Sequence, residues 1–263
     1  MTLPVTRRNA SNLYLMLTLG LAPIAGAQSL ASRVADVGTD AVSFHFAARP
    51  GVCGDGEHFI RTGKHQYHGS WSAHRGMEPC HAGPVQVRLT LEDGVVNRVQ
   101  YWVGPLRDRA ARNLGAVSAP EAARYLMTLV ERGSPRVSAK AVMPAVLADS
   151  AVVWPALLSI AKDGFRSTAT RKETMLWLSR FASGAVAGDP NEPFLEHESA
   201  TEDEELKQQA IFVLSQLPRN EGVPQLIDVA KSRQSWRVRS HALFWLGQSG
   251  DARALPLFES LLR

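Results

Sequence analysis

The most constraining feature of this chain is a repeat in its C-terminal part. Residues 208–231 align with residues 240–263 at an offset of 32 residues. Small residues stand at the equivalent position of each repeat and are spaced by 31 to 36 residues: Ala110, Ala141, Thr174, Ala210 and Ala242. Paired amphipathic segments at such a period are typical of a helical solenoid, in which each repeat packs on its neighbours. We therefore expect an extended surface suited to binding a partner.

The apolar spacing after residue 106 predicts the individual helices. Residues 118–121, Ser-Ala-Pro-Glu, have the pattern of a capping box that begins a helix, and an earlier helix is expected around Ala110 and Leu114. Helix pairs are then expected at about 136–148 with 151–162, 203–217 with 222–233, and 236–247 with 252–262. Residues 106–263 are thus predicted to form about five pairs.

The third repeat departs from this pattern. Its first helix is expected at about 168–182, but the region of its second helix, residues 188–205, contains eight carboxylates and no lysine or arginine. Such a composition has little apolar surface to bury. It predicts an exposed acidic loop at 188–205.

Residues 28–105 follow the two-residue period of β-strands instead. Strands are expected at 42–46, 85–91 and 99–103. A three-residue loop at 92–94 would pair Leu91 with Val95 and Val87 with Val99. Residues 47–83 are rich in glycine and histidine and are expected to form a long loop.

The N-terminus has the order of a secretory signal peptide. Arg7 and Arg8 precede an uncharged run at 13–24 and the small residues at 25–27, so we expect cleavage after Ala27 and a periplasmic or secreted protein. The apolar run is shorter than the roughly 20 residues that span a bilayer, and no membrane insertion is expected after cleavage. The leader contains two of the 29 basic residues and none of the 25 acidic ones, so the mature net charge is about +2. This balance gives no support for nucleic-acid binding.

The chain has two cysteines, Cys53 and Cys80. In an exported protein a pair of cysteines usually forms a disulfide. We therefore expect a bond that staples the small β-rich module at 28–105.

The repeats resemble HEAT repeats, in particular the short bacterial kind. The last unit carries the pattern best, with Val238-Arg239, Ala242, Leu246-Gly247, Gly250-Asp251 and Ala254. The resemblance implies an α-solenoid over residues 106–263 and leaves the function open, because such arrays bind many unrelated partners. No family is recognised for residues 28–105.

An alternative function is suggested by a cluster of histidines. Six of the eight histidines of the chain fall within residues 45–81, and five of them are candidate metal ligands: His58, His65, His68, His74 and His81. Imidazoles with nearby carboxylates can bind zinc or copper. Their spacing matches no known metal motif, so solvated loop histidines are the simpler interpretation.

Basic residues recur three positions before the small residue of each repeat: Arg107, Arg171, Lys207 and Arg239, with Ser138 in the second repeat. Equal positions of a stacked array lie side by side, so these residues are expected to bond the carbonyls of the neighbouring repeat, or an acid, rather than to bind an anion. The second helices are expected to line the concave face and to bind the partner through Lys162, Asp163, Asp228 and Lys231.

The sequence therefore predicts an α+β protein: a C-terminal solenoid of about five HEAT-like helix pairs and a small disulfide-stapled module with a β-hairpin. The expected function is non-enzymatic protein binding or scaffolding without a cofactor, and the alternative is a metal-binding or catalytic N-terminal module. No catalytic residue is predicted.

Overall fold

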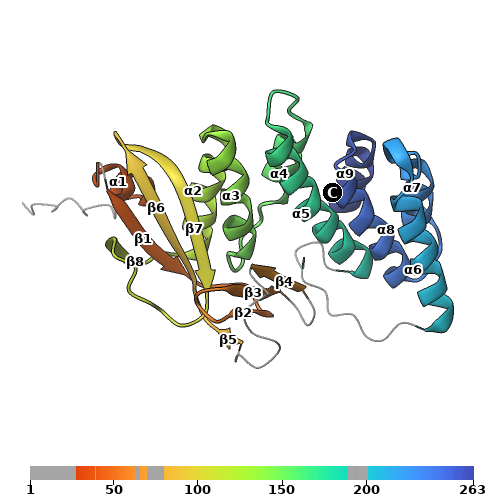
Figure 1. The fold of residues 1–263 in the computed structure, drawn as a ribbon, viewed down its shortest axis with the longest axis horizontal. Coiled ribbons are helices and arrows are strands. Elements are labelled where there is room, and N and C mark those ends of the chain that lie inside the picture. The colour runs from red at the N-terminus through yellow and green to blue at the C-terminus, as the bar shows by residue number, and fades with distance from the viewer. Residues whose placement is uncertain (1–27, 39, 63–65, 70–79, 189–192, 194–200) are drawn as a thin grey trace, which may run out of the picture.

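The computed structural model describes residues 28–38, 40–62, 66–69, 80–188, 193 and 201–263 (Figure 1). The N-terminal region begins with the short helix α1 (Leu30–Ala35) and contains two four-stranded sheets. The larger sheet has the order β7-β6-β1-β8, formed by β1 (Ala41–Phe46), β6 (Val85–Glu92), β7 (Val95–Val103) and β8 (Arg112–Ala116). The smaller has the order β4-β3-β2-β5, formed by β2 (Val52–Gly54), β3 (Phe59–Thr62), β4 (Gln66–Gly69) and β5 (His81–Ala82).

The three predicted strands are confirmed as β1, β6 and β7, whereas the predicted long loop at 47–83 is wrong. Strands β2 to β5 lie within it, and they bury Val52 and Ile60. Glycine makes this second sheet possible, because a Cβ at Gly54 would lie 2.4 Å from the Val103 carbonyl oxygen. The Gly56 N–H donates to the same oxygen at 2.8 Å. The glycine-rich sequence thus provides close backbone packing, not a flexible connection.

The hairpin between β6 and β7 has a different register from the predicted one. Asp93 and Gly94 both have positive φ, 50° and 75°, as in a two-residue turn. Leu91 pairs with Val96, and an irregularity at this point accommodates Asn97 on β7. Val87 accordingly pairs with Tyr101 and not with Val99. Beyond the irregularity the shift is two residues, so Val99 and Tyr101 keep the predicted face. At Leu91 the shift is one residue, and Val95, predicted on the apolar face, is 68 % exposed.

The predicted disulfide is confirmed. The sulfur atoms of Cys53 on β2 and Cys80 lie 2.04 Å apart, and the two Cα atoms lie 5.3 Å apart. Cys80 comes directly before β5, which pairs with β2 through Cys53 and Ala82. The bond therefore links β2, the first strand of the smaller sheet along the chain, to the residue directly before β5, its last strand.

Helices make up most of the described chain from Ala119 onward. They are α2 (Ala119–Arg132), α3 (Pro135–Leu147), α4 (Trp154–Lys162), α5 (Thr168–Ala187), α6 (Glu202–Ser215), α7 (Val223–Lys231), α8 (Trp236–Ser249) and α9 (Leu255–Leu262), with short 3-10 turns at Pro218–Asn220 and Ala252–Ala254. The helix predicted around Ala110 and Leu114 is wrong, because residues 112–116 form β8 and pair in parallel with β1. The helical array therefore begins after residue 118, and not at 106.

The capping pattern at 118–121 starts a helix, but no capping box forms there. Ser118 makes no side-chain cap hydrogen bond, and Glu121 Oε1 accepts the Leu30 N–H at 2.7 Å. A complete capping box is present instead at Thr201 and Glu204. The expected acidic loop is thus wrong at its end, because residues 202–205 form the first turn of α6, where carboxylates interact favourably with the helix dipole. Residues 189–192 and 194–200 of that prediction lie outside the described part of the chain.

The helix hairpins do not stack in sequence order. Helix α8 packs against α5 on one side and against α6 on the other, so that the C-terminal hairpin α8–α9 lies between α4–α5 and α6–α7 (Figure 1). Close packing of α8 on α5 depends on Gly247, where a Cβ would lie 2.3 Å from Ser179 Oγ. The hairpin α6–α7 consequently forms the end of the array away from the sheets.

One continuous hydrophobic core joins the sheets to the helices. Phe44 on β1 meets Tyr125 on α2 edge to face, with ring centroids 6.4 Å apart. The buried Arg49 donates from its backbone N–H to the Leu147 carbonyl at 2.9 Å and from Nε to the Val146 carbonyl at 2.8 Å. These contacts fix the larger sheet on the end of α3. Among the described residues, no helix combines the length and apolar character needed to cross a membrane.

Candidate functional site

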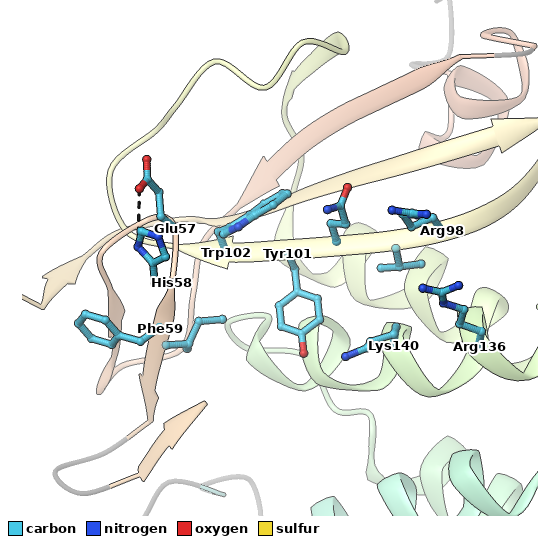
Figure 2. A pocket seen from close by; sticks show the side chains of 11 residues that line it. Glu57, His58, Phe59, Arg98, Tyr101, Trp102, Arg136 and Lys140 are labelled. Carbon is cyan, nitrogen blue, oxygen red and sulfur yellow. Dashed lines mark ion pairs between the residues drawn. The ribbon is translucent and has the colours of Figure 1, made fainter. Parts of the chain in front are cut away.

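A cavity of about 370 Å³ opens where the two sheets meet α3 (Figure 2). Five consecutive residues of β7, from Arg98 to Trp102, line it. The rest of the lining comes from the segment leading into β3 and from α3: Glu57, His58, Phe59, Ile60, Arg136 and Lys140. We call this site the β7 cleft.

The alternation of β7 determines which side chains enter the cleft. Val99 is buried toward the helices, whereas Arg98 on the opposite face is exposed. Tyr101 points toward α3, and its hydroxyl donates to Met143 Sδ at 3.3 Å. Burial, with a smaller effect from the charge of Glu173, raises the pKa of Tyr101 to about 12. The phenol is therefore protonated at neutral pH and is unsuited to act as a base.

One wall of the cleft is cationic. Arg98 comes from β7, and Arg136 and Lys140 come from successive turns of α3 (Figure 2). All three are exposed, and among the described residues none of them forms an ion pair. Burial raises the pKa of Glu173, which accepts a hydrogen bond from Trp177 Nε1 at 2.9 Å, and the charge of Lys140 acts in the opposite direction. The wall therefore presents three cationic groups to a ligand.

The opposite end of the cleft has carboxylates whose charges are already balanced by other groups of the same chain. Asp55 Oδ1 accepts backbone N–H groups from Glu57 and His58, both at 2.8 Å. Burial works to raise the pKa of Asp55, but these hydrogen bonds together outweigh it, and the pKa is lowered. Glu57 pairs with Arg107 Nη1 at 2.7 Å and lies 3.6 Å from His58 Nδ1. The carboxylates of this end therefore already have cationic or hydrogen-bonding partners.

The floor of the cleft is held by the segment between β7 and β8. The Arg109 guanidinium lies over the Trp102 ring, 3.6 Å from its centroid. Gln86 Nε2 donates to the Pro105 carbonyl at 2.8 Å, and its Oε1 accepts the Arg107 N–H at 3.1 Å. Trp102 is thus fixed in place before any ligand arrives.

The predicted metal ligands find no support among the described side chains. His58 contacts Asp55 Oδ2 at 3.2 Å, and His81 is exposed on β5. His65 and His74 lie outside the described residues, and of His68 only the backbone, in β4, is described. Within the described ranges, histidine, cysteine, aspartate and glutamate form no group of three or more that could hold a metal ion.

The residues predicted to bind the partner do not line the β7 cleft. Lys162 on α4 pairs with Glu259 on α9, with 2.5 Å between Nζ and Oε2. Asp163 accepts from Arg166 Nε at 2.9 Å. Asp228 and Lys231 are exposed on α7. These four residues belong to the helical array, and they remain candidates for a partner-binding surface separate from the β7 cleft.

The recurring basic position contributes to packing at three repeats, as predicted. Arg171 Nε donates to the Ala161 carbonyl at 3.2 Å, and Arg239 Nε donates to the Ala230 carbonyl at 3.0 Å. Ser138 Oγ donates in the same way to the Gly133 and Leu129 carbonyls. At the other two positions the basic residue pairs with an acid instead: Arg107, which lies in the β-rich region and not in a helical repeat, pairs with Glu57, and Lys207 pairs with Asp203 on its own helix.

The sequence patterns did not identify Arg98, Arg136 and Lys140 as one site. Alternation along β7 predicts that Tyr101 faces the core, but no local pattern predicts that α3 runs beside this strand. The cleft exists because α3 packs against β7 while β3 approaches the end of the same strand.

Comparison with known proteins identifies one family. Residues 192–263 match the family model of HEAT repeats. Searches of curated proteins and of solved structures give no match. The matched segment contains α6 to α9, the four helices in which the repeat is strongest in the sequence. The C-terminal helices α6 to α9 are therefore similar to HEAT repeats.

Proposed function

We propose that this chain is a non-enzymatic protein-binding scaffold, and that its β7 cleft binds an extended acidic segment of a partner protein. HEAT repeats in general serve protein interaction and scaffolding. The single observation that carries the finer proposal is that five consecutive residues of an edge strand line the cavity beside a cationic wall.

The edge position of β7 favours an extended ligand. The strand pairs with β6 on one side and is the outermost strand of its sheet. Unpaired edge groups can accept an additional strand from another chain, whose backbone provides affinity and whose alternate side chains provide specificity. A peptide beside β7 would place its side chains alternately toward α3 and toward Trp102.

The charge of the cleft favours acidic side chains on that segment. Arg136 and Lys140 lie on α3 and Arg98 lies on β7 (Figure 2), so an added strand would have the first two on its inner side and Arg98 on its outer side. Carboxylates at alternate positions would all point to the inner side and meet Arg136 and Lys140 in a partly enclosed site, where charge pairing is stronger than on an open surface. Three cations facing one short edge match a peptide better than the long regular array of phosphates in a nucleic acid.

Export is part of this proposal. It is supported by the leader-like order of residues 1–27 and by the cysteine pair, since disulfides persist mainly in oxidising compartments. N-terminal sequencing of the protein from its native host should begin at Gln28. A chain that keeps Met1 would contradict export by this route.

Binding can be tested with a fluorescent peptide of about eight alternating glutamate and valine residues, since strands are commonly this long. We expect saturable anisotropy, and we expect the double variant Arg136→Glu/Lys140→Glu to weaken binding by at least roughly tenfold. The control is Arg124→Glu/Arg132→Glu, which changes the same charge at exposed positions of α2 outside the cleft.

Two further results would decide the mode of binding. Amide exchange in β7 should slow when the peptide binds, because an added strand protects the edge. Equal binding of a lysine–valine peptide, or equal loss of binding in the α2 control, would overturn the proposed role of the cationic wall.

A further inference from the structure

Helix α6 has two apolar faces, and the array covers one of them. Ile211, which is 3 % exposed, faces the neighbouring helices. On the opposite side lies a row of apolar residues, three of which are highly exposed: Leu206 at 61 %, Val213 at 61 % and Leu217 at 39 %. Leu206, the exposed Ala210 and Val213 follow the i, i+4, i+7 spacing of one helix face, and Leu217, two residues past the C-terminal end of α6, continues this spacing. We call Leu206, Ala210, Val213 and Leu217 the outer stripe.

Two residues of the outer stripe correspond to residues that are buried in the neighbouring repeat. At the 32-residue offset Leu206 is equivalent to Val238, and Ala210 to Ala242. Val238 and Ala242 on α8 are 2 % and 0 % exposed, because α8 has helices on both sides. Helix α6 thus has the composition of an internal helix but lies at the end of the array (Figure 1). Terminal repeats normally carry a polar outer face.

We propose that a second copy of this chain covers the outer stripe, so that two arrays join end to end through antiparallel α6 helices. The stripe is self-complementary about its centre. An antiparallel two-fold arrangement places Leu206 opposite Leu217 of the second copy and Ala210 opposite its Val213, so a leucine pair closes each end of the contact and the smaller Ala–Val pairs lie at its centre. The contact continues the helix layer that already runs from α5 through α8 to α6 within one chain.

The charges at the two ends of α6 favour the same orientation. Its first turn carries Glu202, Asp203 and Glu205, of which Asp203 pairs with Lys207. Arg219 follows the C-terminal end of α6 with a side chain that is 86 % exposed and that pairs with Glu221 at 2.9 Å. In an antiparallel pair each Arg219 lies beside the acidic first turn of the other copy, and the helix dipoles are also opposed. A parallel pair would instead bring the two acidic turns together.

A small apolar groove beside the stripe provides further contact area. Its volume is about 150 Å³, and its lining includes Ala210, Ile211, Val229 and Val238. Because Ala210 belongs to both the groove and the stripe, a side chain from the second copy can enter the groove as the helices meet.

Sedimentation equilibrium of the full-length mature protein tests this proposal. We expect a concentration-dependent dimer, and we expect Val213→Glu to raise its dissociation constant by at least roughly tenfold by placing a charge opposite Ala210 of the second copy. The matched control is Val152→Glu, because Val152 is 62 % exposed and Val213 is 61 % exposed. Circular dichroism verifies that both variants fold.

Cysteine cross-linking tests the orientation and does not depend on the glutamate variant. A mixture of Leu206→Cys and Leu217→Cys chains should form a disulfide between chains, whereas Leu206→Cys alone should not, since its two copies would lie about 16 Å apart along antiparallel helices.

Three results would overturn the proposal: a monomer at all concentrations, a dimer that Val213→Glu leaves intact, or efficient cross-linking of Leu206→Cys alone. A monomer would mean that another part of the same chain, or a different protein, covers the stripe. Peptide binding in the β7 cleft is a separate measurement, so either proposal can fail without the other.

Discussion

Lys162 Nζ on α4 lies 2.5 Å from Glu259 Oε2 on α9. This ion pair connects residues 97 positions apart and ties the C-terminal hairpin to the middle of the array. Lys162 therefore links two hairpins through an ion pair, whereas the equivalent lysine, Lys231, is exposed at the array's end. The position of a hairpin in space has given two equivalent residues different roles.

The Lys162–Glu259 pair predicts a pH-dependent effect on stability. The hydrogen bond from Lys162, ahead of the charge of Arg263, lowers the pKa of Glu259 in the folded protein. A lowered carboxyl pKa contributes stability above the unfolded pKa, and this contribution is lost as the pH falls. We expect Lys162→Met to lower the melting temperature slightly at neutral pH, and this difference to shrink below about pH 4.3 and to vanish only once the pH is below the lowered pKa of Glu259 in the folded protein. Lys231→Met is the control and should leave the melting temperature unchanged at both pH values.

Removal of the recurring arginine should destabilise the array. Arg239→Ala deletes the donor to the Ala230 carbonyl, at 3.0 Å, between α7 and α8. We expect a loss of about 1 to 2 kcal/mol in the free energy of unfolding, measured by urea denaturation. Arg233→Ala, at an exposed position in the same connection, should change it by less than about 0.5 kcal/mol. Equal effects of the two substitutions would argue against a specific role for the hydrogen bond.

The smaller sheet should tolerate no side chain at Gly54. An added Cβ would lie 2.4 Å from the Val103 carbonyl oxygen and 2.7 Å from the Phe59 carbonyl oxygen. Gly54→Ala should therefore cost more than about 2 kcal/mol, because backbone atoms must move. Gly164→Ala is the comparison, since nothing lies within 4 Å of a Cβ there. A melting temperature equal to that of the unaltered protein would show that the two sheets can separate without cost.

Loss of the disulfide should affect the sheets and not the helices. Cys53→Ser/Cys80→Ser removes a link across 27 residues, which corresponds to about 3 to 4 kcal/mol from the reduced entropy of the unfolded chain. We expect faster amide exchange in β2 and β5, with little change in the helical circular dichroism signal. Slowed or unchanged exchange in these strands would contradict a stapling role.

The sequence by itself determined the features that depend on local pattern or on a small number of possibilities. With two cysteines there is one intramolecular disulfide, Cys53–Cys80. The apolar alternation of β1, β6 and β7 fixed their buried faces, because successive side chains of a strand point to opposite sides. Helices α8 and α9 followed from the amphipathic period of a segment that matches the HEAT family.

Tertiary structure decided which segments are neighbours. Residues 112–116 form β8 rather than a helix because pairing with β1 supplies their backbone hydrogen bonds. The short sequence of this segment is compatible with both structures, so it does not reveal that partner. The hairpin α8–α9 lies between α5 and α6 because the packing surfaces of the helices determine which repeats can be neighbours. At the contact of α8 with α5, for example, Gly247 leaves the space that Ser179 occupies. The β7 cleft and the exposed outer stripe of α6 both follow from such long-range placement. Sequence periodicity fixes the face that each helix buries, and only packing of the whole chain fixes which element covers it.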